Sequence, residues 1–144
     1  MQTGHVGINV TDLDRSQTFY QTILGLQEMG GSRDDGRRFA FLGDGANIVL
    51  TLWEQAEGRF DRASAGLHHL SFRVDSPDAV RRAEAAVRGL GARVHHDGVV
   101  AHREGADSGG IFFEDPDGTR LEIFAPGAGR DQAAPANGPA CGFF

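Results

Sequence analysis

The feature that most constrains the fold of this chain is a short pattern that occurs twice. Residues 5–10 read His-Val-Gly-Ile-Asn-Val, and residues 69–74 read His-Leu-Ser-Phe-Arg-Val. In both, a histidine precedes apolar residues at every second position, which is typical of a half-buried β-strand. The sequence therefore predicts two copies of one structural module, which begin with strands headed by His5 and His69.

Each copy of the strand pattern is followed by the start of a helix. Thr11-Asp12 precedes the first helix and Ser76-Pro77 precedes the second, where serine suits the N-cap and proline suits the first helical position. Apolar residues then recur three and four positions apart, so that one face of each helix can pack inward. Both predicted helices end near a glycine, which is Gly25 in the first copy and Gly89 or Gly91 in the second.

Short apolar runs follow each helix and predict a small meander of strands. These runs cover residues 26–30, 37–42 and 46–53 in the first copy and 92–96, 98–103, 109–114 and 119–125 in the second. The predicted fold class is α+β, with two paired βαβββ modules. We place module one at residues 1–54, a linker at 55–66, module two at 67–125 and a flexible tail rich in Ala, Gly and Pro at 126–144.

Side-chain alternation places a small set of polar residues on one face of these strands. The apolar residues of each first strand must face the helix, so His5 and His69 point to the opposite face. The same argument places Glu122, on the last strand, on that face. Two imidazoles and one carboxylate suit a divalent transition metal and form the ligand set of many non-haem Fe(II) enzymes. If the two sheets curve around a shared cavity, all three side chains can converge in it.

Further residues are candidates for substrate binding and acid–base chemistry. Arg73 and Arg120 suit an anionic group, whereas Trp53 and Phe124 suit an aromatic one. His102, on a middle strand of the second module, is a candidate general acid or base because histidine titrates near neutral pH. Each has a structural alternative: the arginines can pair with nearby acids, the aromatic rings can pack, and the histidine can lie at the surface.

The composition argues against several classes of protein. The chain has 14 basic and 20 acidic residues and a formal net charge of −6, which argues against nucleic-acid binding. No apolar run approaches the roughly 20 residues needed to cross a bilayer, and the N-terminus does not read as a signal segment. The single cysteine, Cys141, cannot form an internal disulfide, which fits a reducing cytoplasm. We expect a cytoplasmic domain that binds a small-molecule substrate rather than a membrane or a nucleic acid.

Several longer motifs resemble those of the vicinal oxygen chelate superfamily, which includes glyoxalase I, extradiol dioxygenases, methylmalonyl-CoA epimerase, fosfomycin-modifying thiol transferases and bleomycin-resistance proteins. The resemblance covers about residues 4–125. It rests on residues 5–16, HVGINVTDLDRS, with Phe19-Tyr20 and Leu24-Gly25-Leu26, on residues 69–75, HLSFRVD, and on residues 113–118, FEDPDG, followed by Leu121-Glu122.

This resemblance implies a fold, a metal and an assembly. Superfamily members have paired βαβββ modules whose curved sheets surround a metal site, and the ligand positions map to His5, His69 and Glu122. The metal is expected to be divalent, with Fe(II) favoured and Mn(II), Ni(II) or Zn(II) as alternatives. Members of this size are usually homodimers.

One departure from the superfamily bears on the reaction. Glyoxalase I and the epimerase use a fourth ligand, Glu or Gln, on the last strand of the first module. The equivalent position here is expected at Val49 or Leu50, which cannot bind metal, and Glu54 and Gln55 lie beyond the expected end of the strand. A three-ligand site resembles those of extradiol dioxygenases and fosfomycin enzymes more than that of glyoxalase I.

The favoured interpretation is a metal-dependent enzyme, namely a non-haem Fe(II) oxygenase resembling extradiol dioxygenases. Its substrate would be small and would offer two neighbouring oxygens, as a catechol does. The first alternative is a divalent-metal thiol transferase or glyoxalase-like enzyme of detoxification or antibiotic resistance, although the chain contains no lysine to bind a phosphonate. The second alternative is a metal-free drug-binding resistance protein.

Overall fold

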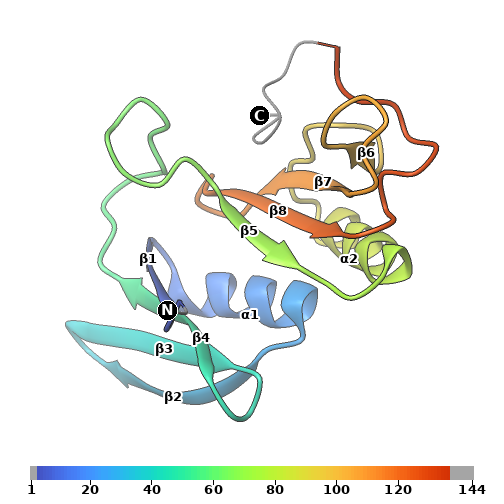
Figure 1. The fold of residues 1–144 in the computed structure, drawn as a ribbon. Helices are drawn as coiled ribbons and strands as arrows, with labels where there is room; N and C mark the ends of the chain where they lie inside the picture. Colours follow the sequence, from blue (N-terminus) through green and yellow to red (C-terminus); the bar gives the residue numbers. More distant parts are fainter. Residues whose placement is uncertain (1–2, 137–144) are drawn as a thin grey trace. The chain divides into compact units, whose positions relative to one another are not determined.

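The computed structural model describes residues 3–136, and the chain divides into two compact units, Met1–Phe60 and Asp61–Phe144. The boundary lies inside the segment predicted as a linker. The first unit contains β1 (Val6–Val10), α1 (Leu13–Leu24), β2 (Gln27–Asp34), β3 (Arg37–Gly43) and β4 (Ile48–Glu54). The second contains β5 (Leu70–Arg73), α2 (Pro77–Gly89), β6 (Val100–Ala101), β7 (Gly109–Glu114) and β8 (Arg120–Ala125) (Figure 1). The predicted α+β class with two βαβββ modules is confirmed.

The two sheets share one topology. The strand order is β1-β4-β3-β2 in the first sheet and β5-β8-β7-β6 in the second. The first and last strands of each module pair in parallel, and the other neighbouring strands pair antiparallel. Residues near the two ends of a module's sequence, such as Ser71 and Glu122, therefore lie side by side in its sheet.

Both helices begin where the sequence predicts. The Asp12 carboxylate accepts a hydrogen bond from Arg15 N at 2.9 Å, and the Ser76 hydroxyl accepts one from Ala79 N at 3.2 Å. These N-caps satisfy backbone donors that a helix cannot satisfy itself. Helix α1 ends at Gly25, whose φ of 67° is a left-handed conformation that glycine adopts without strain. Over residues 3–136, neither helix is long and apolar enough to cross a membrane.

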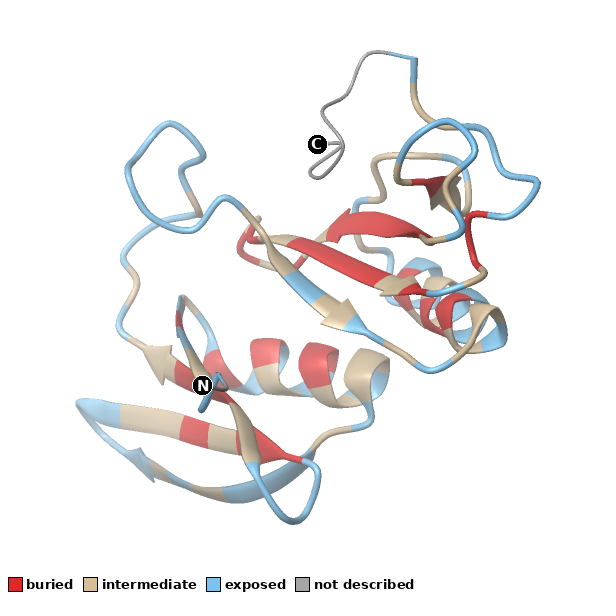
Figure 2. Cartoon of the chain, viewed as in Figure 1, coloured by how far each residue is buried: buried red, intermediate tan, exposed pale blue. Residues whose placement is uncertain are grey.

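Each helix packs its apolar face on its own sheet, and the buried residues gather there (Figure 2). On β1, Ile8 and Val10 are buried, whereas Gly7 and Asn9, together with His5 just before the strand, are exposed, as the alternation predicts. Fully buried core residues include Leu13, Tyr20, Leu50 and Leu52 in the first unit and Val80, Val87, Ile111 and Ile123 in the second.

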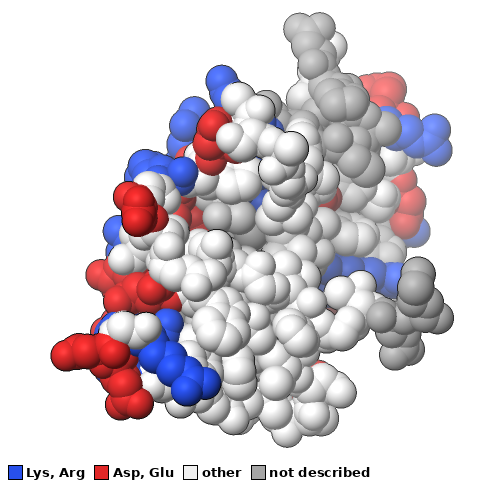
Figure 3. Space-filling view, turned by 90° about the vertical axis from the view of Figure 1, so that its left-hand side faces the viewer, with Lys and Arg blue, Asp and Glu red and all other residues white. Residues whose placement is uncertain are grey.

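Surface charges of opposite sign lie close together. On the face drawn in Figure 3, basic and acidic side chains adjoin one another beside a broad uncharged area. Within the first unit, Arg33 pairs with Glu28 at 3.4 Å, and Arg38 pairs with Asp14 at 2.8 Å. Charge in these places is therefore balanced locally.

The middle of the second module departs from the prediction. Residues 92–96 and 98–103 were expected to form strands, but a single bridge joins Val94 to Phe113, and β6 has only two residues. The physical reason is local. Gly98 has a φ of 90°, which interrupts an extended chain, and Gly105 turns the segment back toward β7 with a φ of 69°.

The chain after β8 packs back on the second unit. Gly129 N donates to Asp107 O at 2.9 Å, and Ala101 N donates to Ala133 O at 3.2 Å. Ala128 is buried. Residues 137–144 of the predicted tail, with Cys141, lie outside the described residues.

Glu54 joins β4 to the start of α1. Its Oε2 accepts a hydrogen bond from Leu13 N at 2.6 Å, and its Oε1 accepts one from Arg38 Nε at 2.9 Å. The side chain is therefore engaged on the helix side of the sheet, together with Leu50 and Leu52.

We expect Glu54→Ala to lower the free energy of unfolding of the first unit by about 1–3 kcal/mol. The substitution removes a charge-assisted hydrogen bond to the helix N-terminus and one carboxylate partner of Arg38. Urea unfolding followed by fluorescence of Trp53, the only tryptophan, measures this unit directly. Glu57→Ala removes an exposed carboxylate nearby and is the control. Equal midpoints for the two variants would contradict the expectation.

Candidate functional site

Glu122 is a buried carboxylate with a histidine on each side. It lies in β8 and is only 4% exposed. Its Oε1 is 2.6 Å from His102 Nε2, and its Oε2 is 3.5 Å from His69 Nε2. Ser71 lies beside it across the parallel pair and donates a side-chain hydrogen bond to the carboxylate. We call these four side chains, Glu122, His69, His102 and Ser71, the Glu122 cluster.

The cluster holds Glu122 in its ionised form. Burial opposes ionisation, but the hydrogen bonds from His102 and Ser71 and the attraction to His102 and His69 outweigh it, so the pKa of Glu122 lies below its ordinary value. Burial, which outweighs the charge of Glu122, lowers the pKa of His69. At neutral pH the carboxylate is therefore anionic and the His69 imidazole neutral, which are the forms that bind metal ions.

His102 has a protein partner at both ring nitrogens. Its Nδ1 lies 2.8 Å from Ser108 Oγ, opposite the contact of Nε2 with Glu122. Its ring centroid is 5.5 Å from that of Phe124 and 6.3 Å from that of Phe112. With its side chain 14% exposed, His102 is an interior component of the second unit.

The other predicted site residues are divided between the two units. Phe124 lies in β8 beside Arg73 of β5, and Arg120 begins β8. In the first unit, the Trp53 ring stacks on Phe39 with centroids 4.8 Å apart. His5 is exposed and directly precedes β1. The second unit thus brings together His69, Glu122, His102 and Phe124, whereas His5 and Trp53 belong to the first unit.

In the first module, the position equivalent to Glu122 is Thr51. Glu122 lies beside Ser71 across β5–β8, and Thr51 lies beside Gly7 across β1–β4. Ser71 and Gly7 each come two residues after a predicted ligand histidine. The two parallel pairs therefore match residue by residue, with a carboxylate in one and a hydroxyl in the other.

This register corrects the expectation that the equivalent position is Val49 or Leu50. Leu50 is fully buried on the helix side, and Val49 lies two residues before the matching position. Alternation indicates only which face a side chain takes, whereas the hydrogen-bonded ladder fixes the partner. Thr51 Oγ1 accepts a hydrogen bond from Trp53 Nε1 at 3.1 Å, so the position still offers no carboxylate or amide ligand.

The donors of the Glu122 cluster have the chemistry of a metal site, but the cluster is not a complete one. Over residues 3–136, no three His, Cys, Asp or Glu side chains are arranged to hold a metal ion. His69 and Glu122 supply an imidazole and a carboxylate, which together suit a divalent transition metal. The third predicted ligand, His5, is part of the first unit.

Two serines of this site were given no role from the sequence. Alternation from His69 puts Ser71 on the same strand face as that histidine, but its hydrogen bond to Glu122 depends on the parallel register. Ser108 lies in the loop before β7, where no periodic pattern indicates its contact with His102. A hydroxyl two residues after a candidate ligand histidine is a signal that could have indicated Ser71.

Comparison with known proteins gives the family. The profile of the Glyoxalase/Bleomycin resistance protein/Dioxygenase superfamily matches residues 2–123. The chain belongs to this superfamily. A lactoylglutathione lyase of Haemophilus influenzae is 35% identical over 134 residues, which cover 85% of this chain and 91% of the lyase. A catechol-2,3-dioxygenase of Bacillus subtilis is 27% identical over 124 residues, which cover 85% of this chain but only 40% of the dioxygenase.

Solved structures of the superfamily share the fold. A glyoxylase/bleomycin resistance protein/dioxygenase domain from Frankia matches with a TM-score of 0.73 and 28% identity, covering 88% of this chain and 92% of that one. A variant of the fosfomycin resistance protein FosX from Listeria monocytogenes, with Mn(II) and 1S,2S-dihydroxypropylphosphonic acid bound, matches with a TM-score of 0.67 and 17% identity, covering 87% and 92%. The predicted superfamily is thus confirmed, and its members include enzymes of the glyoxalase and dioxygenase type.

Proposed function

We propose that this superfamily member is a metal-dependent enzyme in which His69, Glu122 and His5 hold a divalent ion. The observation that carries the proposal is Glu122, an ionised carboxylate that is 4% exposed and has an imidazole on each side. Burying a carboxylate costs several kcal/mol unless a charge or strong hydrogen bonds compensate. Hydrogen bonds from His102 and Ser71 compensate that cost and keep Glu122 anionic. A divalent cation would bind this anion, and neutral His69 would supply a second donor.

The ion would supply Lewis acidity toward two neighbouring oxygens of a substrate. The chain's own residues bind and orient that substrate. Phe124 and Trp53 offer aromatic surface to a planar group, and Arg73 and Arg120 offer cationic side chains to an anionic one. We propose a homodimer as the assembly, Fe(II) as the first choice of metal, and Mn(II), Ni(II) or Zn(II) as alternatives.

Among the reactions of the superfamily, we propose oxygenation of a small aromatic or otherwise bidentate substrate. Thr51 favours it, because a hydroxyl stands at the position of the first module that the strand register makes equivalent to Glu122. Three protein ligands leave coordination positions for substrate and dioxygen. A glyoxalase-like enzyme is the second candidate, and the 35% identity with the H. influenzae lyase over 91% of its length favours it.

Elemental analysis combined with oxygen uptake tests this proposal. Protein purified without added metal is expected to contain stoichiometric iron and to consume oxygen with a catechol. Chelation should stop the uptake, and anaerobic Fe(II) should restore it. Isomerisation of a glutathione hemithioacetal without oxygen uptake would support the second candidate. A chain with no affinity for any of the four metals would contradict both and support a metal-free binding protein.

A further inference from the structure

We infer that His102 is a positioning residue for Glu122 and that Ser108 fixes the tautomer in which it acts. The three side chains form one line of contacts, from Ser108 Oγ to His102 Nδ1 at 2.8 Å and from His102 Nε2 to Glu122 Oε1 at 2.6 Å. The inference rests on the proposed function, because it concerns the carboxylate that would bind the metal.

The chemistry of the three groups determines which atom donates and which accepts in each hydrogen bond. An ionised carboxylate only accepts hydrogen bonds, so His102 Nε2 carries a hydrogen and donates a hydrogen bond to Glu122 Oε1. In the neutral tautomer with its hydrogen on Nε2, Nδ1 is an acceptor to which the Ser108 hydroxyl, 2.8 Å away, can donate. Removing that hydroxyl removes the preference for a proton on Nε2.

This arrangement distinguishes the two oxygens of Glu122. Oε1 is held by His102, whereas Oε2 is the oxygen on the His69 side, 3.5 Å from His69 Nε2. The carboxylate would therefore bind the ion through Oε2, the oxygen that shares its side with the other ligand. Groups that orient a ligand in this way commonly affect metal affinity by roughly 10–100-fold.

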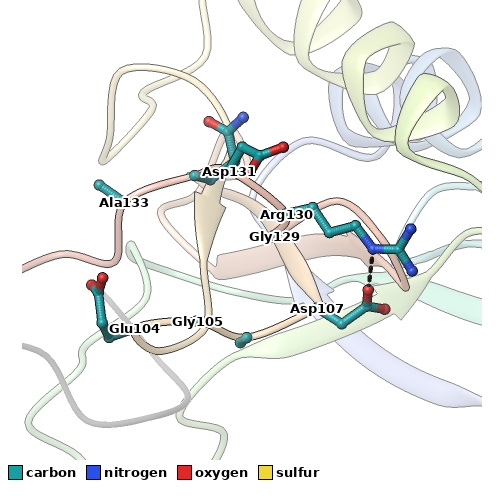
Figure 4. Close-up of a pocket in the computed structure, with 9 residues that line it drawn as sticks. Glu104, Gly105, Asp107, Gly129, Arg130, Asp131 and Ala133 are labelled. Carbon is teal, nitrogen blue, oxygen red and sulfur yellow. Dashed lines mark hydrogen bonds and ion pairs between the residues drawn. The ribbon is translucent and has the colours of Figure 1, made fainter.

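Backbone contacts fix the positions of His102 and Ser108 relative to each other. The β6–β7 pairing continues past Ala101 and Gly109, because His102 N donates to Ser108 O at 3.2 Å. The segment after β8 also contacts the loop between β6 and β7, where Arg130 pairs with Asp107 at 2.5 Å. This ion pair lies beside a pocket of about 600 Å³ lined by residues 104–107 and 129–133 (Figure 4). A Cβ on Gly129 would lie only 2.3 Å from Ser108 O, so the close approach of this segment to Ser108 requires glycine at position 129.

These contacts favour positioning over proton exchange with substrate. Both His102 nitrogens are engaged by protein groups, and its ring lies beside those of Phe112 and Phe124. The role of general acid or base that the sequence offers for His102 requires one nitrogen to reach the substrate instead. The two roles differ in what a glutamine at position 102 can restore, because an amide donates a hydrogen bond but does not exchange protons near neutral pH.

The experiment measures Mn(II) affinity by electron paramagnetic resonance in the full chain. We expect His102→Ala to weaken binding by roughly 10–100-fold, His102→Gln to recover most of the loss, and Ser108→Ala to show a smaller loss. His95→Ala is the matched control, because His95 Nε2 lies 3.1 Å from the Glu114 carboxylate in the same unit but outside the cluster. ¹⁵N NMR of the metal-free protein should show the Nε2–H tautomer of His102 and a mixture in Ser108→Ala.

Each outcome separates the inference from the proposed function. Unchanged Mn(II) affinity in His102→Ala, alongside a loss in Glu122→Gln, overturns the inference alone. Full metal affinity without turnover in both His102→Ala and His102→Gln overturns it too, because that result assigns His102 to proton transfer and not to positioning. An Nδ1–H tautomer in the wild-type chain contradicts the role of Ser108. No Mn(II) binding by the wild-type chain overturns both the inference and the proposed function.

Discussion

Replacing Glu122 by glutamine is expected to weaken Mn(II) binding by more than roughly 100-fold, beyond the effect of losing an outer partner. Glutamine matches the size of glutamate and can still take part in hydrogen bonds with His102 and Ser71. It carries no negative charge, however, and an amide oxygen is a weaker ligand than a carboxylate. Titration of Mn(II) into each metal-free protein, followed by electron paramagnetic resonance, measures the loss.

Glu114→Gln is the control for this substitution. Glu114, in β7, also has a histidine partner, His95, and a cation, Arg93, at 3.5 Å. The control removes one carboxylate from the same sheet and leaves the Glu122 cluster intact. Equal Mn(II) affinities for the two variants would refute the assignment of Glu122 as a ligand.

The wild-type chain and Glu122→Gln should also differ in how their metal-free stability depends on pH. Because the pKa of Glu122 in the folded chain lies below its ordinary value of 4.5, ionisation of Glu122 stabilises the fold above about that pH. The contribution is lost as the pH falls from 4.5 through the lowered pKa. The wild-type chain should therefore lose this advantage over Glu122→Gln in acid, and a difference that grows in acid would contradict the lowered pKa.

Phe112→Ala is expected to lower the free energy of unfolding of the second unit by about 3–5 kcal/mol. Phe112 is fully buried and lies directly opposite Glu122 in the β7–β8 pair. Its ring adjoins those of His102 and His96, with centroids 6.3 and 5.8 Å away. Removing the ring leaves a cavity beside the cluster, so we also expect weaker Mn(II) binding.

Far-ultraviolet circular dichroism during urea unfolding measures this loss, and Trp53 fluorescence shows whether the first unit is unaffected. Phe112→Leu keeps most of the volume and should cost less than about 1.5 kcal/mol. A fluorescence transition that moves with the circular dichroism transition would show that the substitution does not act on the second unit alone. Equal stability of the alanine and leucine variants would refute a packing role for the ring.

The fold was largely predictable because its determinants are local. Asp12 and Ser76 cap their helices through hydrogen bonds to the third residue beyond, and Gly25 ends α1, so a few adjacent residues suffice to predict each boundary. The length of β6 was not predictable, because Gly98 interrupts a run that otherwise alternates as a strand does.

The candidate site was predictable in part. Alternation placed His69 and Glu122 on one face, and the structure brings their side chains within 3.5 Å. The contact of His102 with Glu122 crosses from β6 over β7 to β8 and depends on two registers, which alternation along single strands does not contain. Thr51 was missed for the same reason.

The pairing of first and last strands within each module keeps the described backbone ladders of the two sheets separate. Every hydrogen-bonded strand pair among residues 3–136 joins strands of one unit, so a substitution in one sheet leaves the ladder of the other intact. Equivalent positions of the two ladders can then carry different groups, here the hydroxyl of Thr51 and the carboxylate of Glu122. A substitution at position 51 is therefore expected to change the group that the first module offers without altering the strand pairing that positions Glu122.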